Sequence, residues 1–184
     1  MSLEESNSKL EVGEPTPEFT LENFEGQEVA LSDLDNFDGV LIIFMCNHCP
    51  YVKAQTDEIR ELAEEFSSIA VVGINPNAET HPDDSVEKME AFIEENNLES
   101  SNFFYLADPD QRVAEAYSAE CTPDPFLLDW RHRLHYHGRL NYKMNPDEEV
   151  EEREMKSIIE KMLKRKEPPE ELEASQGCSI KWKD

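Results

Sequence analysis

Cys46 and Cys49 are separated by two residues, and this Cys-x-x-Cys pair is the pattern in the sequence that most clearly indicates redox chemistry. A cysteine attacks a disulfide only as its thiolate, and in such pairs its pKa falls from about 8.5 to between about 3.5 and 7.5. The short spacing brings Cys49 close enough to attack a mixed disulfide on Cys46. His48 lies between them, and a protonated imidazole there would favour the thiolate and make the disulfide more oxidising. The pattern therefore predicts a couple that cycles between dithiol and disulfide.

The two cysteines follow a buried strand and precede a helix. Residues Val40–Met45 are all apolar, and this run is too short to cross a membrane but typical of a strand buried on both faces. Apolar side chains then recur with helical spacing through Pro50–Phe66. Cys46 would then lie just before a helix, where unpaired N–H groups and the positive end of the helix dipole stabilise an anion. We therefore predict that Cys46 carries the thiolate.

The remaining apolar pattern predicts alternating strands and helices. Val12–Leu34 indicates a β-hairpin around Gly26, and Ile69–Ile74 is a second buried strand that completes a right-handed βαβ unit. The later elements are predicted as a helix with apolar positions at Val86, Met89 and Ile93, a strand at Phe103–Leu106, a short helix at Gln111–Tyr117, a hairpin of Phe126–Asp129 and Leu134–Gly138, and a last helix that begins at Asn145 and Pro146. This order predicts an α/β fold with a mixed central sheet, helices on both faces and an N-terminal β-hairpin extension.

A chain of 184 residues is long enough for one domain with a sizeable core. We predict a disordered tail over residues 1–11, one folded domain over 12–166, and a C-terminal tail over 167–184 that contains Cys178. Met1–Leu10 lacks a basic start and an apolar centre, so we do not expect a signal peptide there. The expected compartment is the cytoplasm, where a Cys-x-x-Cys pair is more typical of catalysis or metal binding than of a structural disulfide.

The strongly acidic composition limits the partners of this protein. The sequence has 42 acidic and 17 basic residues, which gives a net charge of −25. This excess repels nucleic acids and anionic membranes, so we expect neither as a partner. Such a composition is typical of a protein that must stay dispersed in concentrated salt, and we hypothesise a halophilic or salt-tolerant source.

Half of a structural zinc site is the alternative interpretation of the Cys-x-x-Cys pair. Structural zinc needs about four ligands, usually from two such pairs. The two other cysteines, Cys121 and Cys178, are isolated and far apart in the sequence. Redox chemistry is therefore favoured, with no metal or other cofactor assigned. A redox-inactive binding module with a structural Cys-x-x-Cys stays open as an alternative.

Four segments carry a resemblance to a known family: Pro17–Leu21 (PEFTL), Phe44–Val52 (FMCNHCPYV), Cys121–Asp124 (CTPD) and Gly177–Lys183 (GCSIKWK). From about residue 12 to residue 184 the chain resembles the thioredoxin-fold superfamily. Within it, the chain is similar to the alkyl hydroperoxide reductase/thiol-specific antioxidant (AhpC/TSA, peroxiredoxin-like) branch that carries a Cys-x-x-Cys. The resemblance implies that residues 12–166 form a thioredoxin-like domain with antioxidant activity.

The resemblance also implies roles for single residues. Cys46 is the attacking cysteine, and Cys49 is the resolving cysteine. Pro123 matches a cis-proline that packs beside the active-site disulfide and presents the backbone of Thr122 to substrate.

The two remaining cysteines are candidate additional redox thiols. Cys121 lies two residues before Pro123 and therefore near the expected site, although a cysteine in such a place is often a small buried hydrophobe. Cys178 could reach back to form a disulfide with Cys46, Cys49 or Cys121, or it could be an inert packing residue.

The main prediction is a thiol–disulfide oxidoreductase that uses Cys46 and Cys49 on protein or low-molecular-weight disulfides. The alternative is a peroxiredoxin-like thiol peroxidase that acts on peroxides. Peroxiredoxins place Pro-x-x-x-Thr-x-x-Cys around the peroxide-reacting cysteine. Alignment on Cys49 puts Cys46 at the threonine position and Ile42 at the proline position, and Arg60 is a loose match for the distant basic partner. This incomplete set favours disulfide exchange over peroxide reduction.

The excess of acidic residues can be tested by unfolding in salt. Because salt screens repulsion between like charges, we expect a higher thermal unfolding midpoint in roughly 1 M KCl than in dilute buffer. Circular dichroism melts at the two KCl concentrations would measure the difference. Equal midpoints would contradict the hypothesis of a salt-adapted protein.

Overall fold

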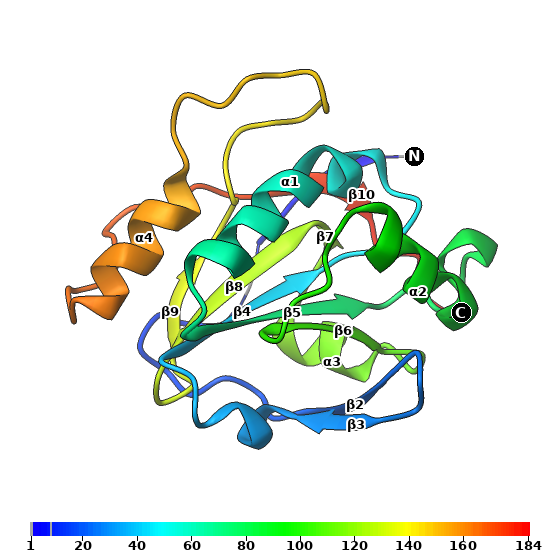
Figure 1. Ribbon diagram of the computed structural model, residues 1–184, viewed down its shortest axis with the longest axis horizontal. Helices are drawn as coiled ribbons and strands as arrows, with labels where there is room; N and C mark the ends of the chain where they lie inside the picture. The colour runs from blue at the N-terminus through cyan, green and yellow to red at the C-terminus, as the bar shows by residue number, and fades with distance from the viewer. Residues whose placement is uncertain (1, 8) are drawn as a thin grey trace.

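A seven-stranded sheet is the centre of the computed structural model, which describes residues 2–7 and 9–184 (Figure 1). The strands lie in the order β3-β2-β6-β5-β4-β8-β9. Their bounds are β2 (Thr20–Asn23), β3 (Glu28–Ala30), β4 (Gly39–Phe44), β5 (Ile69–Asn75), β6 (Phe103–Ala107), β8 (Asp124–Asp129) and β9 (Leu134–His137). The helices are α1 (Pro50–Glu65), α2 (Val86–Glu95), α3 (Arg112–Tyr117) and α4 (Glu154–Leu163), with 3-10 turns η1 (Leu31–Leu34) and η2 (Pro82–Asp84).

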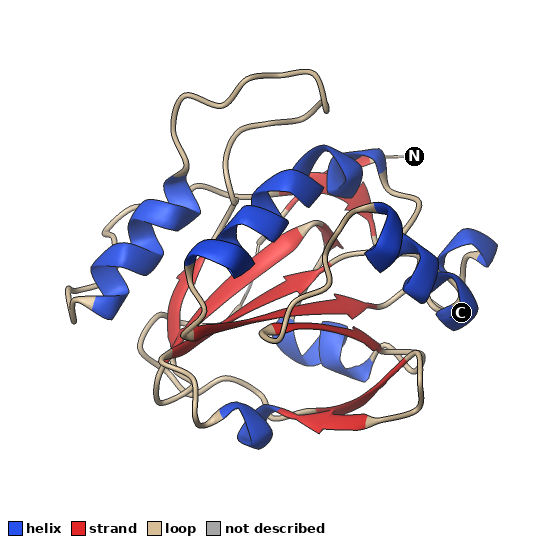
Figure 2. Ribbon diagram, in the orientation of Figure 1, coloured by secondary structure: helices blue, strands red, loops and turns tan. Residues whose placement is uncertain are grey.

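The sheet is mixed, as predicted. Its central strand β4 pairs in parallel with β5 and antiparallel with β8, so that Ile42 lies between Val72 and Phe126. β6 continues the parallel part beyond β5, and β2 joins β6 antiparallel. Helices cover both faces of the sheet, with α1 and α4 on one side and α3 on the other (Figure 2). The α/β architecture with a mixed central sheet is therefore confirmed.

Alternating side chains of β4 build a core on each face of the sheet. Leu41 and Ile43 belong to a buried cluster that also contains apolar side chains of α1, α2 and α4. Val40, Ile42 and Phe44 belong to a second buried cluster that contains side chains of α3 and η1. All six residues of β4 are buried, as expected for a central strand covered on both faces. This packing fixes the point at which β4 ends and the Cys-x-x-Cys segment begins.

The predicted N-terminal β-hairpin is present at one edge of the sheet. β2 and β3 pair antiparallel, with Leu21 opposite Val29. The turn between them contains Gly26 at φ +77°, a backbone conformation that side-chain-bearing residues rarely adopt. The side chain of Asn23 closes the same turn, because its Oδ1 accepts hydrogen bonds from the N–H groups of Glu25 and Gln27.

A second, three-stranded sheet joins segments from both ends of the chain. β1 (Leu3–Glu5) pairs antiparallel with β10 (Gln176–Ser179), and β10 pairs antiparallel with β7 (Cys121–Thr122). The predictions of disorder at Leu3–Glu5 and of a tail at Gln176–Ser179 are therefore wrong. Hydrogen bonds between backbones hold these strands together. Such bonds do not require alternating apolar residues, so the sequence pattern gave no sign of the strands. Met1 and Ser8, which the prediction of disorder also covered, lie outside the described residues, and the domain boundaries stay a prediction.

The last helix begins later than predicted. Asn145 lies in the loop before α4, where the carboxylate of Glu148 accepts hydrogen bonds from the N–H groups of Met144 and Asn145. The N–H of Glu148 donates to the carbonyl oxygen of Asn145, which closes a local turn. Side-chain hydrogen bonds of this kind compete with a helix at Asn145, and α4 begins at Glu154.

The helices of the described residues lack the length and apolar composition needed to cross a bilayer. The longest of these, α1, has 16 residues and carries charged side chains along much of its length.

Asn102 ties the end of α1 to the start of β5 and offers a test of this packing. Its buried side-chain amide donates hydrogen bonds to the carbonyl oxygens of Ala63, Phe66 and Ile69, at 2.9, 3.2 and 2.9 Å. Asn102→Ala removes this donor from buried carbonyls, so we expect the free energy of unfolding to fall by about 2 kcal/mol. Urea unfolding followed by circular dichroism would measure the loss.

Asn96→Ala is the matched control for Asn102→Ala. The Asn96 side chain makes a single hydrogen bond to the carbonyl oxygen of Phe92, within the end of α2. Its removal should cost less than about 1 kcal/mol. Equal losses in the two variants would contradict the linking role of Asn102.

Candidate active site

The turn between β4 and α1 places the two cysteines of the motif differently. β4 ends at Phe44 and α1 begins at Pro50, so Cys49 immediately precedes the helix while Cys46 lies in the loop. Proline suits the first helical position because its fixed φ is already helical and it has no N–H group to satisfy. The unpaired amides of the first turn therefore act on Cys49, to which the N–H of Val52 donates a hydrogen bond.

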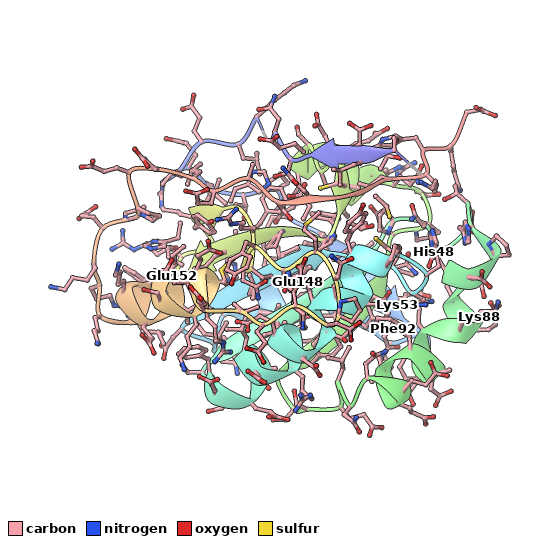
Figure 3. The ribbon with its side chains drawn as sticks, turned by 90° about the horizontal axis from the view of Figure 1, so that it is seen from above. His48, Lys53, Lys88, Phe92, Glu148 and Glu152 are labelled. Atoms are coloured by element: carbon pink, nitrogen blue, oxygen red, sulfur yellow. The ribbon has the colours of Figure 1, made fainter. Side chains whose placement is uncertain are left out.

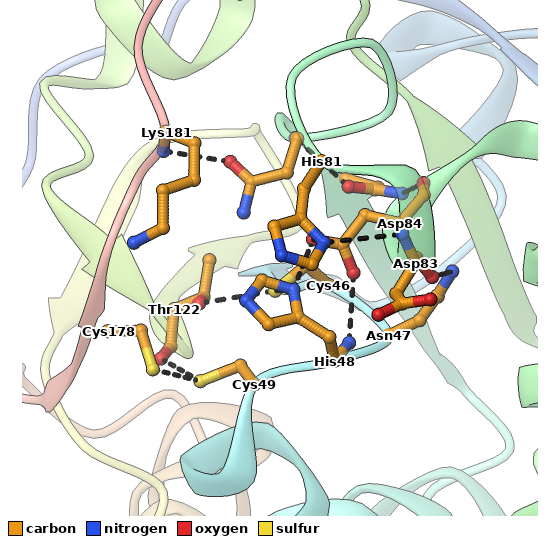
Figure 4. A network of polar contacts seen from close by, with 12 residues as sticks. Cys46, Asn47, His48, Cys49, His81, Asp83, Asp84, Thr122, Cys178 and Lys181 are labelled. Carbon is orange, nitrogen blue, oxygen red and sulfur yellow. Dashed lines mark hydrogen bonds and ion pairs between the residues drawn. The ribbon is translucent and has the colours of Figure 1, made fainter. Parts of the chain in front are cut away.

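Three thiol groups meet at this turn (Figure 4). The Sγ atom of Cys49 lies 3.0 Å from the Sγ atom of Cys178 and 3.2 Å from the carbonyl oxygen of Thr122. The Sγ atom of Cys46 lies 3.7 Å from Nδ1 of His48 and 3.6 Å from Oγ1 of Thr122, and the ionisation of its thiol is linked to that of Cys49. Cys46 and Cys49 are fully buried, and none of the four cysteines is in a disulfide. The structure thus brings together the predicted redox pair and one of the two candidate additional thiols.

Hydrogen bonding places the negative charge on Cys49. A hydrogen bond from Cys46 is the main cause that lowers the pKa of Cys49 to about 5, with further help from Cys178 and Val52 against the opposing effect of burial. The same contact with Cys49, then burial and the Asp84 carboxylate, raise the pKa of Cys46 well above its usual range. These pKa shifts favour Cys49 over Cys46 as the thiolate, and the prediction made for Cys46 stays a prediction. Its physical premise was sound, but the helix begins directly after Cys49 rather than after Cys46.

The peptide bond between Thr122 and Pro123 is cis, as the resemblance implied. Thr122 lies in β7, and its Oγ1 atom is 3.6 Å from the Sγ atom of Cys46. Both residues therefore lie at the thiol cluster. The backbone of Thr122 differs from the expectation in one respect, because it pairs with Cys178 of β10. The edge that was expected to receive substrate is occupied by this strand.

His48 faces a buried carboxylate. Its Nδ1 atom lies 2.5 Å from Oδ2 of Asp84 and 3.7 Å from Sγ of Cys46, and its backbone N–H donates to Oδ1 of Asp84 at 2.9 Å. The ring of His81 stacks on the ring of His48, with 3.7 Å between the centroids. Of the cysteines at the site, His48 thus contacts Cys46. The effect of His48 on the redox potential stays a prediction.

Asp84 and His81 belong to the site although the sequence pattern did not single them out as site residues. Asp84 is fully buried, and its backbone carbonyl accepts a hydrogen bond from the side chain of Asn75 at 2.7 Å. The signal that could have found them is topological. β4 and β5 are adjacent parallel strands, so the loops after their carboxyl ends lie at the same edge of the sheet. Cys46 and His48 follow one strand, while His81 and Asp84 follow the other.

Cys121 and Arg60 contribute less than the sequence suggested. The Sγ atom of Cys121 lies 3.7 Å from the carbonyl oxygen of Pro123, and burial is the main cause that raises the pKa of its thiol. Cys121 therefore packs as a neutral thiol next to the site. Arg60 pairs with Asp57 and Glu64 along α1, so its guanidinium is directed to carboxylates of its own helix.

Cys46, His48 and Asp84 could hold a metal ion. One ligand atom of each residue lies within 4.8 Å of the others, and thiolate, imidazole and carboxylate are the ligands that zinc prefers. This set differs from the zinc site considered from the sequence, because it contains only one cysteine of the pair. Cys46 would have to lose its proton to bind a metal.

A groove of about 540 Å³ opens beside His48. Figure 3 shows His48, Lys53, Lys88 and Phe92 gathered at this side of the molecule. These four residues line the groove together with Asn47, Asp83, Ala91, Glu95 and Asn96. The amino group of Lys88 pairs with Asp83 at 2.7 Å. Asn47 and His48, which lie between the two cysteines in the sequence, thus form part of the wall of the groove.

Comparison with known proteins gives matches in sequence and in structure. A model of the AhpC/TSA family matches residues 12–137. A Helicobacter pylori protein assigned as a peroxiredoxin bcp is 33% identical over 114 residues, which cover 60% of this chain and 68% of that protein. The structure of an uncharacterized conserved protein from Geobacillus kaustophilus superimposes with a TM-score of 0.89 and 36% identity over 100% of this chain and 97% of that chain.

A third match bears on the fold. The thioredoxin domain of a thiol-disulfide oxidoreductase from Bacteroides vulgatus superimposes with a TM-score of 0.56 and 22% identity, over 68% of this chain and 86% of that chain. The predicted thioredoxin-like fold is therefore confirmed.

The position of the thiolate can be tested by ultraviolet absorbance, which distinguishes a thiolate from a thiol without a reagent that must enter the site. We expect a titration with a midpoint near pH 5 in the reduced protein, because the pKa of Cys49 is about 5. Cys46→Ala removes the main donor to Cys49, so the midpoint should rise by about one unit or more.

Cys121→Ala is the control for this titration, since the Cys121 thiol stays neutral and should leave the midpoint unchanged. A wild-type midpoint near the ordinary cysteine pKa of about 8.5 would contradict the assignment. So would a midpoint that is the same with and without Cys46.

Proposed function

Because the chain belongs to the AhpC/TSA family, we propose that it is a thiol peroxidase in which Cys49 reacts with a hydroperoxide. Family and fold together make it a thioredoxin-fold oxidoreductase. A relative assigned as a peroxiredoxin favours the peroxidase over disulfide exchange, which was the first expectation from the sequence. The observation that carries the proposal is the environment of Cys49: it lies directly before α1, its Sγ atom is 3.0 Å from the Sγ atom of Cys178, and its pKa is lowered to about 5.

The proposed reaction uses the thiolate directly. The sulfur of Cys49 attacks one oxygen of the hydroperoxide, so that an S–O bond forms and the O–O bond breaks. The released alkoxide or hydroxide takes a proton and leaves as an alcohol or water. Cys49 becomes a sulfenic acid, and the hydroperoxide is reduced by two electrons. Since the pKa of Cys49 is about 5, the reactive form prevails at neutral pH.

The surroundings of the thiols favour a small substrate. Cys46 and Cys49 are fully buried, so a protein disulfide could not contact them without a rearrangement of the chain. The backbone of Thr122, which the resemblance offered to a substrate, is already paired with β10. The groove beside His48, with a volume of about 540 Å³, has room for a small hydroperoxide.

Thiol–disulfide exchange is the second candidate function. The contact between Cys46 and Cys49 and the cis-Pro123 beside them favour it. Low-molecular-weight disulfides would suit the buried site better than protein disulfides. The redox-inactive binding module has less support, because a structural role does not require a thiolate at Cys49. A cytoplasmic location stays a prediction.

Stopped-flow kinetics with hydrogen peroxide would test the peroxidase. We expect the reduced protein to consume peroxide, and Cys49→Ser to lower the rate constant by about 100-fold or more, because a serine hydroxyl is not ionised near neutral pH. The rate constant should be level above pH 6 and fall by about tenfold per unit below pH 5, since Cys49 is protonated there. Cys46→Ser should keep the first turnover.

Insulin reduction with dithiothreitol separates the alternatives. Fast insulin reduction that depends on Cys46, combined with background peroxide consumption, would replace the peroxidase by disulfide exchange. Background rates in both assays would leave the redox-inactive binding module as the favoured function. One equivalent of zinc in the freshly purified protein, lost in Cys46→Ser, would identify Cys46 as a zinc ligand of that module.

A further inference from the structure

β10 brings a third cysteine directly to the reactive sulfur. The Sγ atoms of Cys178 and Cys49 lie 3.0 Å apart, although 129 positions separate the two residues in the sequence (Figure 4). In the small sheet Cys178 lies opposite Thr122 of β7 on one side and opposite Leu3 of β1 on the other. Backbone pairing on both edges therefore fixes the position of Cys178.

The residue before Cys178 permits this close approach. A Cβ atom at Gly177 would lie 2.0 Å from the carbonyl oxygen of Thr122 and 2.6 Å from its carbonyl carbon, so no larger residue fits without moving β10. Two residues earlier, the hydroxyl of Ser175 donates a hydrogen bond of 2.6 Å to the carbonyl oxygen of Pro123. The sequence around Cys178 is thus adapted to lie against the cis-proline segment.

We propose that Cys178 is the thiol that resolves oxidised Cys49, a step that rests on the proposed peroxidase function. After a hydroperoxide has oxidised Cys49 to its sulfenic acid, the sulfur of Cys178 attacks the sulfur of Cys49. An S–S bond forms, the S–O bond breaks, and the hydroxyl leaves with the thiol proton as water. One hydroperoxide thereby oxidises two thiols to one disulfide.

The charges around Cys178 agree with this order of events. Burial, and the proton that it shares with the Cys49 thiolate, raise the pKa of Cys178 to about 12, so Cys178 is a thiol in the reduced protein. Oxidation of Cys49 removes that anion. The ammonium group of Lys181, which lowers the pKa of Cys178, stays in place. Cys178 is therefore more easily ionised after Cys49 has reacted than before.

Cys46 would then exchange with the new disulfide. The sulfur atoms of Cys46 and Cys49 both contact Thr122, at 3.6 Å from its Oγ1 and 3.2 Å from its carbonyl oxygen, so Cys46 lies against the same residue as the atom that it must attack. Attack of the Cys46 thiolate on Cys49 forms the Cys46–Cys49 disulfide and releases Cys178 as a thiol, without a net change in oxidation state. An external dithiol that reduces the Cys46–Cys49 disulfide closes the cycle.

Trapping of the oxidised states tests the role of Cys178. Reduced wild type, Cys46→Ser and Cys178→Ser would receive one equivalent of hydrogen peroxide with dimedone present, and peptide mass spectrometry would map the products. We expect Cys46→Ser to accumulate a Cys49–Cys178 disulfide. Cys178→Ser should carry several-fold more dimedone on Cys49 than wild type. Ser179→Ala, at the next position of β10, should match wild type.

Gly177→Ala tests the same step with every thiol present. The added Cβ moves β10 away from Thr122, so we expect Cys49 to carry as much dimedone as it does in Cys178→Ser. The first equivalent of peroxide should still be consumed. Gln176→Ala, on the exposed residue beside it, is the matched control. Circular dichroism melts would verify that both variants are folded.

Diamide, which oxidises thiol pairs without peroxide, separates the two proposals. If wild type consumes no peroxide but diamide gives the Cys49–Cys178 disulfide in Cys46→Ser, the peroxidase fails and the pairing of Cys178 with Cys49 stands. If peroxide is consumed but Cys178→Ser forms the Cys46–Cys49 disulfide as fast as wild type and binds no dimedone, the resolving role of Cys178 is overturned.

Discussion

The negative charge on a buried sulfur, that of Cys49, is the constraint on which the site depends. An anion taken out of water is costly unless hydrogen-bond donors replace the solvent. At Cys49 the groups that lower its pKa are the thiols of Cys46 and Cys178, the side chain of Thr122 and the amide of Val52, all of them neutral. The carboxylate of Asp84 meanwhile disfavours an anion on Cys46. Neighbouring thiols thus decide which sulfur is charged, and removal of one thiol changes the chemistry of the others.

The donors reach Cys49 because separate parts of the fold converge there. β4 ends at a fixed depth in the core, and α1 begins at Pro50, so the amides of the first helical turn lie next to the sulfur. β7 and β10 approach from another part of the chain, and β10 carries Cys178. Thr122 and Cys178 lie in strands and Cys49 lies directly before a helix, so regular elements position these three groups. The site is therefore a product of both sheets rather than of the Cys-x-x-Cys segment alone.

The features that could be predicted from the sequence are those with local signals. The apolar run before Cys46 and the helical period after Pro50 gave the strand–turn–helix that holds the motif, and the pattern around Gly26 gave the hairpin. β1 and β10 were missed because short polar strands are held by backbone pairing between distant segments. The preference for Cys49 as the thiolate was not predicted, because it depends on the residue at which α1 begins. Pro50 carries that information, since proline is favoured at the first position of a helix.

The position of Cys178 in the sequence has a consequence for the newly made chain. Cys49 and Thr122 leave the ribosome before β10 exists, so β7 first has an unpaired edge next to a reactive sulfur. Such an edge pairs readily with any extended segment. A foreign extended segment could occupy the place of β10 on this edge until the C-terminal residues have been made. Once β10 has paired with β7, it covers the edge and closes the place next to Cys49.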